Sequence, residues 1–128
     1  MSAPSNWTVL IVDDEPDNIA VLELVLNFHD AQVRIAASGK ECLEILKVEI
    51  PTLVIVDIQM PDMTGYELLE IIRNEPAWKD IPTVAVTALA MNKDSSRIMS
   101  AGFDGYIAKP VDVMTLADDL QKILESKK

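Results

Sequence analysis

The sequence has little of what marks secreted, membrane-spanning or disulfide-bonded proteins. Its 128 residues include one cysteine, Cys42, so no internal disulfide can form. No uninterrupted apolar run exceeds four residues, whereas a helix that crosses a bilayer needs roughly 20. The first seven residues have neither the basic region nor the apolar region of a signal peptide. We therefore expect a cytoplasmic protein without membrane insertion.

Basic residues are also scarce. The chain has 11 lysines and arginines against 21 aspartates and glutamates, a formal net charge of −10, and no basic cluster offsets it. Because nucleic-acid phosphates repel such a chain, direct binding of nucleic acid is not expected. Hydrophobic residues make up 49% of the sequence, which excludes disorder, since disordered chains lack the apolar mass to offset conformational entropy.

Short apolar runs rich in β-branched residues alternate with longer amphipathic stretches, which is typical of β-α units on a parallel sheet. The expected strands cover 8–12, 32–36, 53–56, 83–87 and 105–108. The first, third and fourth are nearly continuous apolar runs, as expected for strands covered on both faces, and the other two are expected nearer an edge. The pattern predicts an α/β fold with a doubly wound five-stranded parallel sheet and five helices. We expect a single domain over 1–128, ordered over about 7–125, because three residues follow the last helix.

Capping signals mark where several helices begin. Pro16 suits the first turn of a helix, where its missing N–H costs nothing. Ser38 with Glu41, and Thr64 with Glu67, have the spacing of a capping box. These signals predict one helix after each of the first three strands.

The last two helices differ in their apolar content. Asp112 is expected as the N-cap of the last helix, which turns Val113 and a regular apolar stripe inward. The helix over 92–101 has Ile98 and Met99 as its large apolar residues. It should therefore be the least firmly held helix, and movement is most plausible there.

Chemically active side chains stand where the predicted strands end. Asp13 and Asp14 follow the first strand, Asp57 follows the third, Thr87 ends the fourth and Lys109 follows the fifth. Ligands of open parallel α/β sheets sit beyond the carboxyl ends of the strands. Three carboxylates, a hydroxyl and an ammonium group should therefore converge at one edge of the sheet.

Such a cluster of acids favours a divalent cation. Two carboxylates about 4 Å apart repel by roughly 4 kcal/mol at an effective dielectric near 20. Oxygen ligands with positions left for water suit Mg²⁺, which would be held by Asp14 with Asp13 as its partner. Asp57 is then placed to be a nucleophile that forms an acyl phosphate, while Lys109 and Thr87 contact the phosphoryl oxygens. No dedicated general base is present, so the product should persist, which suits a signal.

Four segments of the chain resemble a known family, the CheY-like receiver domains of bacterial two-component response regulators. The segments read VLIVDDEP over 9–16, LVIVDIQMPDMTGYE over 53–67, PTVAVTALA over 82–90, and AGFDGYIAKP over 101–110. Their order and spacing cover essentially the whole chain. The resemblance implies a flavodoxin-like sheet of order 2-1-3-4-5 with helices on both faces.

The resemblance also implies a function and its partners. A histidine kinase or a histidine phosphotransfer protein would donate a phosphoryl group to Asp57 in the presence of Mg²⁺, with the backbone carbonyl of Gln59 as a further metal ligand. Thr87 and Tyr106 would reorient and change the surface of the fourth helix, fifth strand and fifth helix. That surface would control a downstream protein in trans, and Met1 leads us to expect a complete gene product. A cis peptide bond before Pro110 is implied in the same way.

Other functions fit parts of this pattern. A Mg²⁺-dependent phosphohydrolase with an aspartyl-phosphate intermediate resembles a D-x-D pattern whose second acid transfers protons, and here Gln59 stands at that place. A flavodoxin-like carrier would bind a flavin phosphate after the first strand, where this chain has three acids in a row. A degenerate receiver would serve only for docking, although every chemical position is filled. The expected protein is therefore not an enzyme that turns over external substrates.

Overall fold

Five parallel strands form one sheet in the order β2-β1-β3-β4-β5. The computed structural model describes residues 3–88 and 92–127. The strands are β1 (Thr8–Val12), β2 (Gln32–Ala36), β3 (Leu53–Asp57), β4 (Thr83–Thr87) and β5 (Gly105–Ala108). The predicted order is confirmed, and β2 and β5 are the edge strands, as their weaker apolar patterns indicated.

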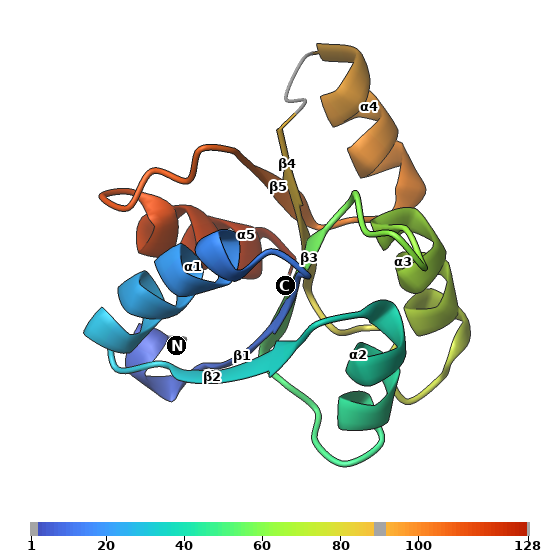
Figure 1. Ribbon diagram of the computed structural model, residues 1–128, viewed down its shortest axis with the longest axis horizontal. Coiled ribbons are helices and arrows are strands. Elements are labelled where there is room, and N and C mark those ends of the chain that lie inside the picture. Colours follow the sequence, from blue (N-terminus) through green and yellow to red (C-terminus); the bar gives the residue numbers. More distant parts are fainter. Residues whose placement is uncertain (1–2, 89–91, 128) are drawn as a thin grey trace.

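Helices cover both faces of the sheet (Figure 1). After a short 3-10 helix, η1 (Pro4–Asn6), the helices are α1 (Pro16–Phe28), α2 (Gly39–Leu46), α3 (Gly65–Asn74), α4 (Asn92–Ala101) and α5 (Leu116–Lys127). One face carries α1 and α5, and the other carries α2, α3 and α4. In the part of the chain that the structure describes, no helix is long and apolar enough to cross a membrane.

Each face of the sheet has its own apolar core. Successive side chains of a strand point to opposite faces, so Val9 and Ile11 of β1 pack with α1 and α5, whereas Leu10 and Val12 pack with α2 and α3. Cys42 lies fully buried in the second core, and burial raises the pKa of its thiol to about 12. A strand covered on both sides needs apolar residues at every position, which explains the continuous runs in β1, β3 and β4.

The predicted helix starts are correct in part. Pro16 occupies the first turn of α1, and Thr64 and Glu67 form a complete capping box at α3. At α2 the Ser38 hydroxyl accepts a hydrogen bond from the Glu41 amide, but the Glu41 carboxylate accepts from the preceding residue, Ala37, so only half of that box forms.

The start of α5 was predicted too early. The helix begins at Leu116, and the Asp112 side chain instead accepts a hydrogen bond from the Met114 amide, 2.9 Å away. Residues 113–115 form a turn, so Val113 is half exposed rather than directed inward. The Asp112 side chain thus stabilises a turn where a first helical turn was expected. The apolar residues of this turn, Val113 and Met114, remain at the surface.

Candidate functional site

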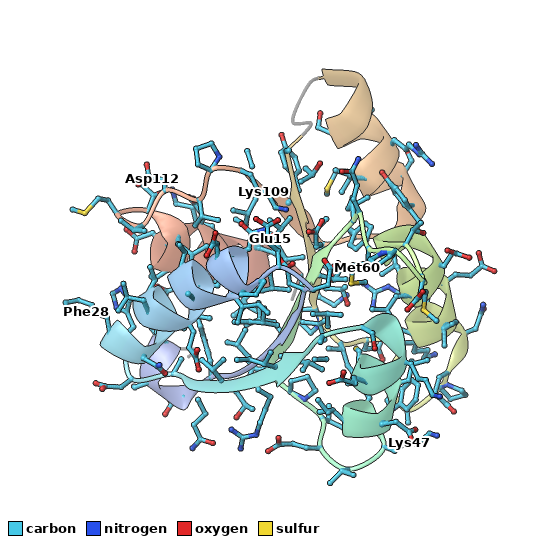
Figure 2. All side chains as sticks on the ribbon, viewed as in Figure 1. Glu15, Phe28, Lys47, Met60, Lys109 and Asp112 are labelled. Carbon is cyan, nitrogen blue, oxygen red and sulfur yellow. The ribbon has the colours of Figure 1, made fainter. Side chains whose placement is uncertain are left out.

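The strand register brings the acidic residues together. Val12 of β1 lies opposite Val56 of β3, so the next residues, Asp13 and Asp57, end adjacent strands. With Asp14 they form a group in which one carboxylate oxygen of each lies within 4.8 Å of the others. Asp13 and Asp57 are buried, with 1% and 5% of their surface exposed, while Asp14 is exposed. Figure 2 labels two neighbours of this group, Glu15 and Lys109.

Among the described residues, two groups from separate parts of the chain donate hydrogen bonds to the Asp57 carboxylate. The Lys109 ammonium, after β5, donates to Asp57 Oδ2 at 2.9 Å, and the Gln59 amide donates to Oδ1 at 2.9 Å. The lysine side chain is one-fifth exposed and that of Asp57 is 6% exposed. A buried carboxylate needs such charged and hydrogen-bonding partners, because desolvation of an unpaired charge is costly.

Asp13 is less well satisfied than Asp57. Its Oδ1 accepts a hydrogen bond from the Glu15 amide at 2.9 Å, but its Oδ2 is buried and has no hydrogen-bond partner among the described residues. Burial raises the pKa of this carboxyl, and the nearby Asp57 and Asp14 raise it further, against the Glu15 hydrogen bond. An unpartnered buried oxygen beside two more acids is the donor set of a hard cation, so these residues fit Mg²⁺.

The remaining predicted residues lie along β4 and β5. Thr87, the last residue of β4, is buried, and its carbonyl oxygen accepts from the Lys109 amide at 2.8 Å. Tyr106 lies in β5 opposite Ala85 and is 36% exposed. The Lys109–Pro110 peptide bond is cis, as the resemblance implied.

Gly65, which positions the loop after β3, was not among the predicted site residues. A Cβ atom at Gly65 would lie 2.9 Å from Ile58 Cα and 3.1 Å from the Asp57 carbonyl oxygen. The Gly65 amide also donates to the Ile58 carbonyl at 2.9 Å. A glycine directly after the N-cap Thr64 was the available signal, since only a residue without a side chain permits so close an approach of two backbones.

A family model for the response regulator receiver domain matches residues 9–121. The chain therefore belongs to the response regulator receiver family, whose members are signalling modules of phosphorelays. Receiver domains of this family work with histidine kinases and phosphotransfer proteins, and typically bind Mg²⁺ at an acidic pocket.

Three known proteins illustrate the similarity. The chain is 30% identical over 117 residues to the polar-differentiation response regulator DivK of Brucella ovis, covering 91% of this chain and 95% of DivK. The chemotaxis response regulator CheY4 of Vibrio cholerae superposes with a TM-score of 0.84 at 28% identity, covering 91% of this chain and 97% of that one. The receiver domain of the sensor histidine kinase PA1611 from Pseudomonas aeruginosa, solved with a magnesium ion coordinated in its active-site cleft, superposes with a TM-score of 0.83 at 27% identity, covering 93% and 98%.

Some relatives are much longer than this chain. It is 36% identical to part of the histidine-protein kinase BarA of Escherichia coli K12 but spans 11% of that protein's length. It spans 28% of a Vibrio cholerae relative that bears the name of a cyclic di-GMP phosphodiesterase. Receiver domains thus occur both alone and within larger proteins.

Proposed function

We propose that this chain is a phosphorylation switch in which Asp57 accepts a phosphoryl group from a histidine kinase or histidine phosphotransfer protein. The observation that supports it best is the buried Asp57 carboxylate, 2.9 Å from the Lys109 ammonium and next to Asp13 and Asp14. A nucleophile, a fixed cation and a metal-binding acid pair are the parts that phosphoryl transfer requires.

In the transfer step, a carboxylate oxygen of Asp57 attacks phosphorus, the P–N bond of the phosphohistidine donor breaks, and an acyl phosphate forms. Lys109 places a positive charge where the phosphoryl oxygens arrive, and Thr87 would offer its hydroxyl to one of them. Asp13, Asp14, Asp57 and the Gln59 carbonyl would hold Mg²⁺, which when bound supplies the charge that offsets the incoming group. The magnesium in the PA1611 receiver domain supports this assignment by similarity.

Among the residues that the structure describes, the site has no group that would discharge the acyl phosphate quickly. The side chain of Gln59, two residues after Asp57, cannot exchange protons. The hydrogen bond from this residue to the Asp57 carboxylate comes from its backbone N–H. The phosphorylated form should therefore persist long enough to act as a signal. For this reason we propose a signalling receiver, not an enzyme that turns over external substrates. We also propose the cytoplasm as its compartment, as the sequence led us to expect. Leu89, whose position bears on this lifetime in the family, lies outside the described residues.

The signal would leave the site through Thr87, Tyr106 and the surface of α4, β5 and α5. Within the described part of α4, Ile98 is fully buried whereas Met99 is half exposed, so one large apolar side chain anchors this part of the helix. An element held by few contacts can shift at small energetic cost, as a two-state switch requires. The changed surface would then control a partner protein in trans.

Labelling with acetyl phosphate tests the proposal. Wild-type protein with Mg²⁺ should incorporate close to one phosphoryl group per chain, whereas Asp57→Asn should stay at background. Omission of Mg²⁺ should slow wild-type labelling more than about tenfold. Asparagine keeps an oxygen for the Gln59 amide, so circular dichroism should confirm that the variant is folded.

Two results would contradict the proposal. Undiminished labelling of Asp57→Asn would place the phosphoryl group elsewhere. Release of many phosphates per chain, without a stable labelled form, would instead indicate the Mg²⁺-dependent phosphohydrolase.

A further inference from the structure

A groove with both apolar and charged walls, the α2 groove, lies where α2 ends beside the edge strand β2. It has a volume of about 350 Å³, and its lining residues are Arg34, Glu44, Ile45, Val48 and Glu49. Val48, in the turn after α2, is 87% exposed, and Ile50, two residues further on, is 53% exposed. Exposed apolar side chains that gather beside a groove mark an interaction surface more often than isolated ones do.

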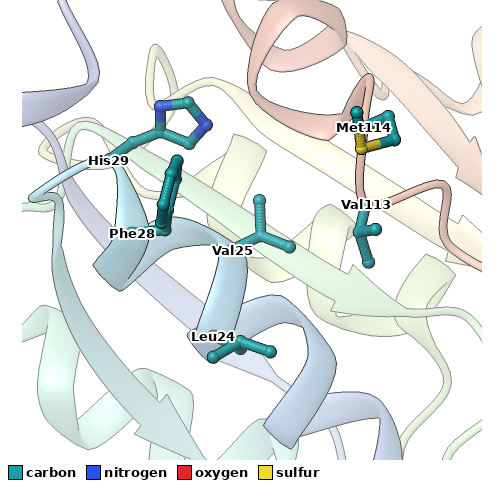
Figure 3. A pocket seen from close by; sticks show the side chains of 6 residues that line it. All are labelled: Leu24, Val25, Phe28, His29, Val113 and Met114. Carbon is teal, nitrogen blue, oxygen red and sulfur yellow. The ribbon is translucent and has the colours of Figure 1, made fainter.

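The charges of the α2 groove set it apart from a larger groove between α1 and the turn before α5 (Figure 3). That larger groove is lined, apart from His29, by apolar side chains alone among the described residues. Its lining therefore does not select one kind of partner over another. A guanidinium and two carboxylates line the α2 groove, and fixed charges of this kind do select the partner.

Charges of opposite sign are paired at the α2 groove. Arg34 Nε lies 3.0 Å from Glu49 Oε1, and Lys47 Nζ lies 2.7 Å from Glu44 Oε2. Residues 32–50 contain three of the 11 lysines and arginines and three of the 21 acids, so the net charge of −10 comes from the rest of the chain. A strongly basic or acidic partner gains little from such a balanced surface, whereas a second copy of the same surface meets both signs.

We propose that the α2 groove is the interface of a weak, symmetric dimer of this chain. In a two-fold dimer one patch faces itself, so the patch must be complementary to itself. The exposed Val48 side chain of each copy would enter the groove of the other, and the cations of each would face the carboxylates of the other. Because the groove is small, we expect a dissociation constant of about 0.1–1 mM.

The edge of β2 does not offer the same partner a strand to pair with. The backbones of Gln32 and Ala36 bond to the β1 side, so the Val33 carbonyl between them points outward. This carbonyl accepts a hydrogen bond from Arg34 Nη1 at 3.3 Å. A charged side chain that covers an edge strand discourages strand addition. Two copies would therefore pack through the α2 groove and would not extend the sheet.

The proposed interface leaves the other surfaces of the molecule open. The α2 groove lies where α2 leads to the start of β3, whereas Asp57 is at the far end of β3. β2 and β5 are opposite edges of the sheet, so α2 and α4 lie far apart (Figure 1). The dimer thus requires neither Mg²⁺ nor phosphorylation, and it would carry two copies of the α4, β5 and α5 surface.

Sedimentation equilibrium of the unphosphorylated protein without Mg²⁺ tests for the dimer, at concentrations from about 20 μM to 1 mM that span the expected dissociation constant. We expect a reversible monomer–dimer equilibrium. An increase of NaCl from about 50 to 500 mM should lower the dissociation constant at least about twofold, because salt screens the repulsion between two chains of net charge −10. An association driven by opposite net charges would instead weaken with salt.

Two substitutions of equal charge locate the interface. Val48→Asp should weaken the dimer at least about tenfold, because it places a charge at the centre of the interface. Met114→Asp is the matched control, since Met114 is 85% exposed and lies outside the α2 groove, and it should stay within about twofold of wild type. Both positions are exposed, so the melting temperatures should hardly change.

Three results would overturn the proposal. The first is a protein that stays monomeric at about 1 mM. The second is equal weakening by Val48→Asp and Met114→Asp. The third is a set of concentration-dependent amide shifts in ¹⁵N-labelled protein at α1 or α4 in place of residues 34 and 44–49. Acetyl phosphate labelling, at protein concentrations too low for the dimer, tests the Asp57 assignment separately.

Discussion

At the scale of single residues, the site repeats one local hydrogen bond. Asp13 accepts from the amide of Glu15, and Asp57 accepts from the amide of Gln59, in both cases two residues further along the chain. Each bond fixes a carboxylate at the end of a strand as the backbone turns away. Because β1 and β3 are neighbours, the two fixed carboxylates lie together although 44 residues separate them in sequence.

Gly65 gives a test of how closely the loop after β3 must be held. Gly65→Ala would place a Cβ atom 2.9 Å from Ile58 Cα, so the backbone that carries Asp57 must shift. We expect the rate of labelling by acetyl phosphate to fall about tenfold, and the free energy of unfolding to fall by about 1–3 kcal/mol.

Gly39 offers a matched control for this substitution. It too is the first residue of a helix after a hydroxyl N-cap, but a Cβ atom there would meet the flexible side chain of Met63. Gly39→Ala should therefore label like wild type. Equal labelling rates for both variants would show that Gly65 does not position Asp57.

At the scale of helices and strands, Asp104 joins three elements at the end of the sheet where β4 and β5 begin. Its carboxylate accepts from Arg73 of α3 at 2.9 Å, from Lys127 of α5 at 2.9 Å, and from the Thr83 amide of β4 at 2.7 Å. Arg73 also donates to the carbonyl of Gly102, before β5. One mostly buried acid thus connects helices from both faces of the sheet.

The loss of this charge should destabilise the fold without affecting the phosphoryl site. Asp104→Asn should lower the free energy of unfolding in urea by about 2–4 kcal/mol, because it leaves the Arg73 guanidinium without its carboxylate. Glu44→Gln, which breaks the exposed Lys47–Glu44 pair, should leave stability unchanged within error. If the two substitutions had equal effects, Asp104 would be an ordinary surface charge.

Strands and helices could be predicted from the sequence better than the contacts between them. Apolar runs, Pro16 and the Thr64 capping box are local signals, and the strands and helix starts that depend on them were found. Asp104 and Arg73 are 31 residues apart in a fold that one sequence does not position, so no local pattern indicated their contact. Val113 was assigned to the core because its spacing continues the apolar stripe of α5, whereas a hydrogen-bonded turn places it at the surface.

At the scale of the whole molecule, opposite ends of the sheet have opposite electrostatic character. Asp104 is balanced by two cations, whereas of Asp13, Asp14 and Asp57 only Asp57 has an ion pair, with Lys109, among the described residues. The carboxylates at the carboxyl end of the sheet therefore repel one another, and the net charge of −10 adds to this repulsion. The predicted acids and Lys109 converge there because the carboxyl ends of parallel strands lie at one edge of the sheet. The alternation of apolar runs with amphipathic stretches was sufficient to predict such a sheet.

This imbalance predicts that Mg²⁺ stabilises the folded protein. A cation that binds the folded form alone raises the free energy of unfolding by about 1.4 kcal/mol for each tenfold increase above its dissociation constant. The melting temperature of wild type should therefore rise with Mg²⁺ concentration, relative to EDTA with NaCl at the same ionic strength.

Asp13→Asn should raise the melting temperature without metal and remove most of the stabilisation by Mg²⁺. Asparagine keeps an oxygen for the Glu15 amide but removes one of the clustered charges, so in EDTA the variant should melt at a higher temperature than wild type. With Mg²⁺ its melting temperature should hardly rise, because a metal ligand is lost. A variant that melts below wild type in EDTA would mean that Asp13 does not contribute to the repulsion. A variant that responds to Mg²⁺ as wild type does would mean that Asp13 does not hold the ion. Calorimetry of both proteins over a Mg²⁺ series separates these two effects, since the first is read without metal and the second from the slope.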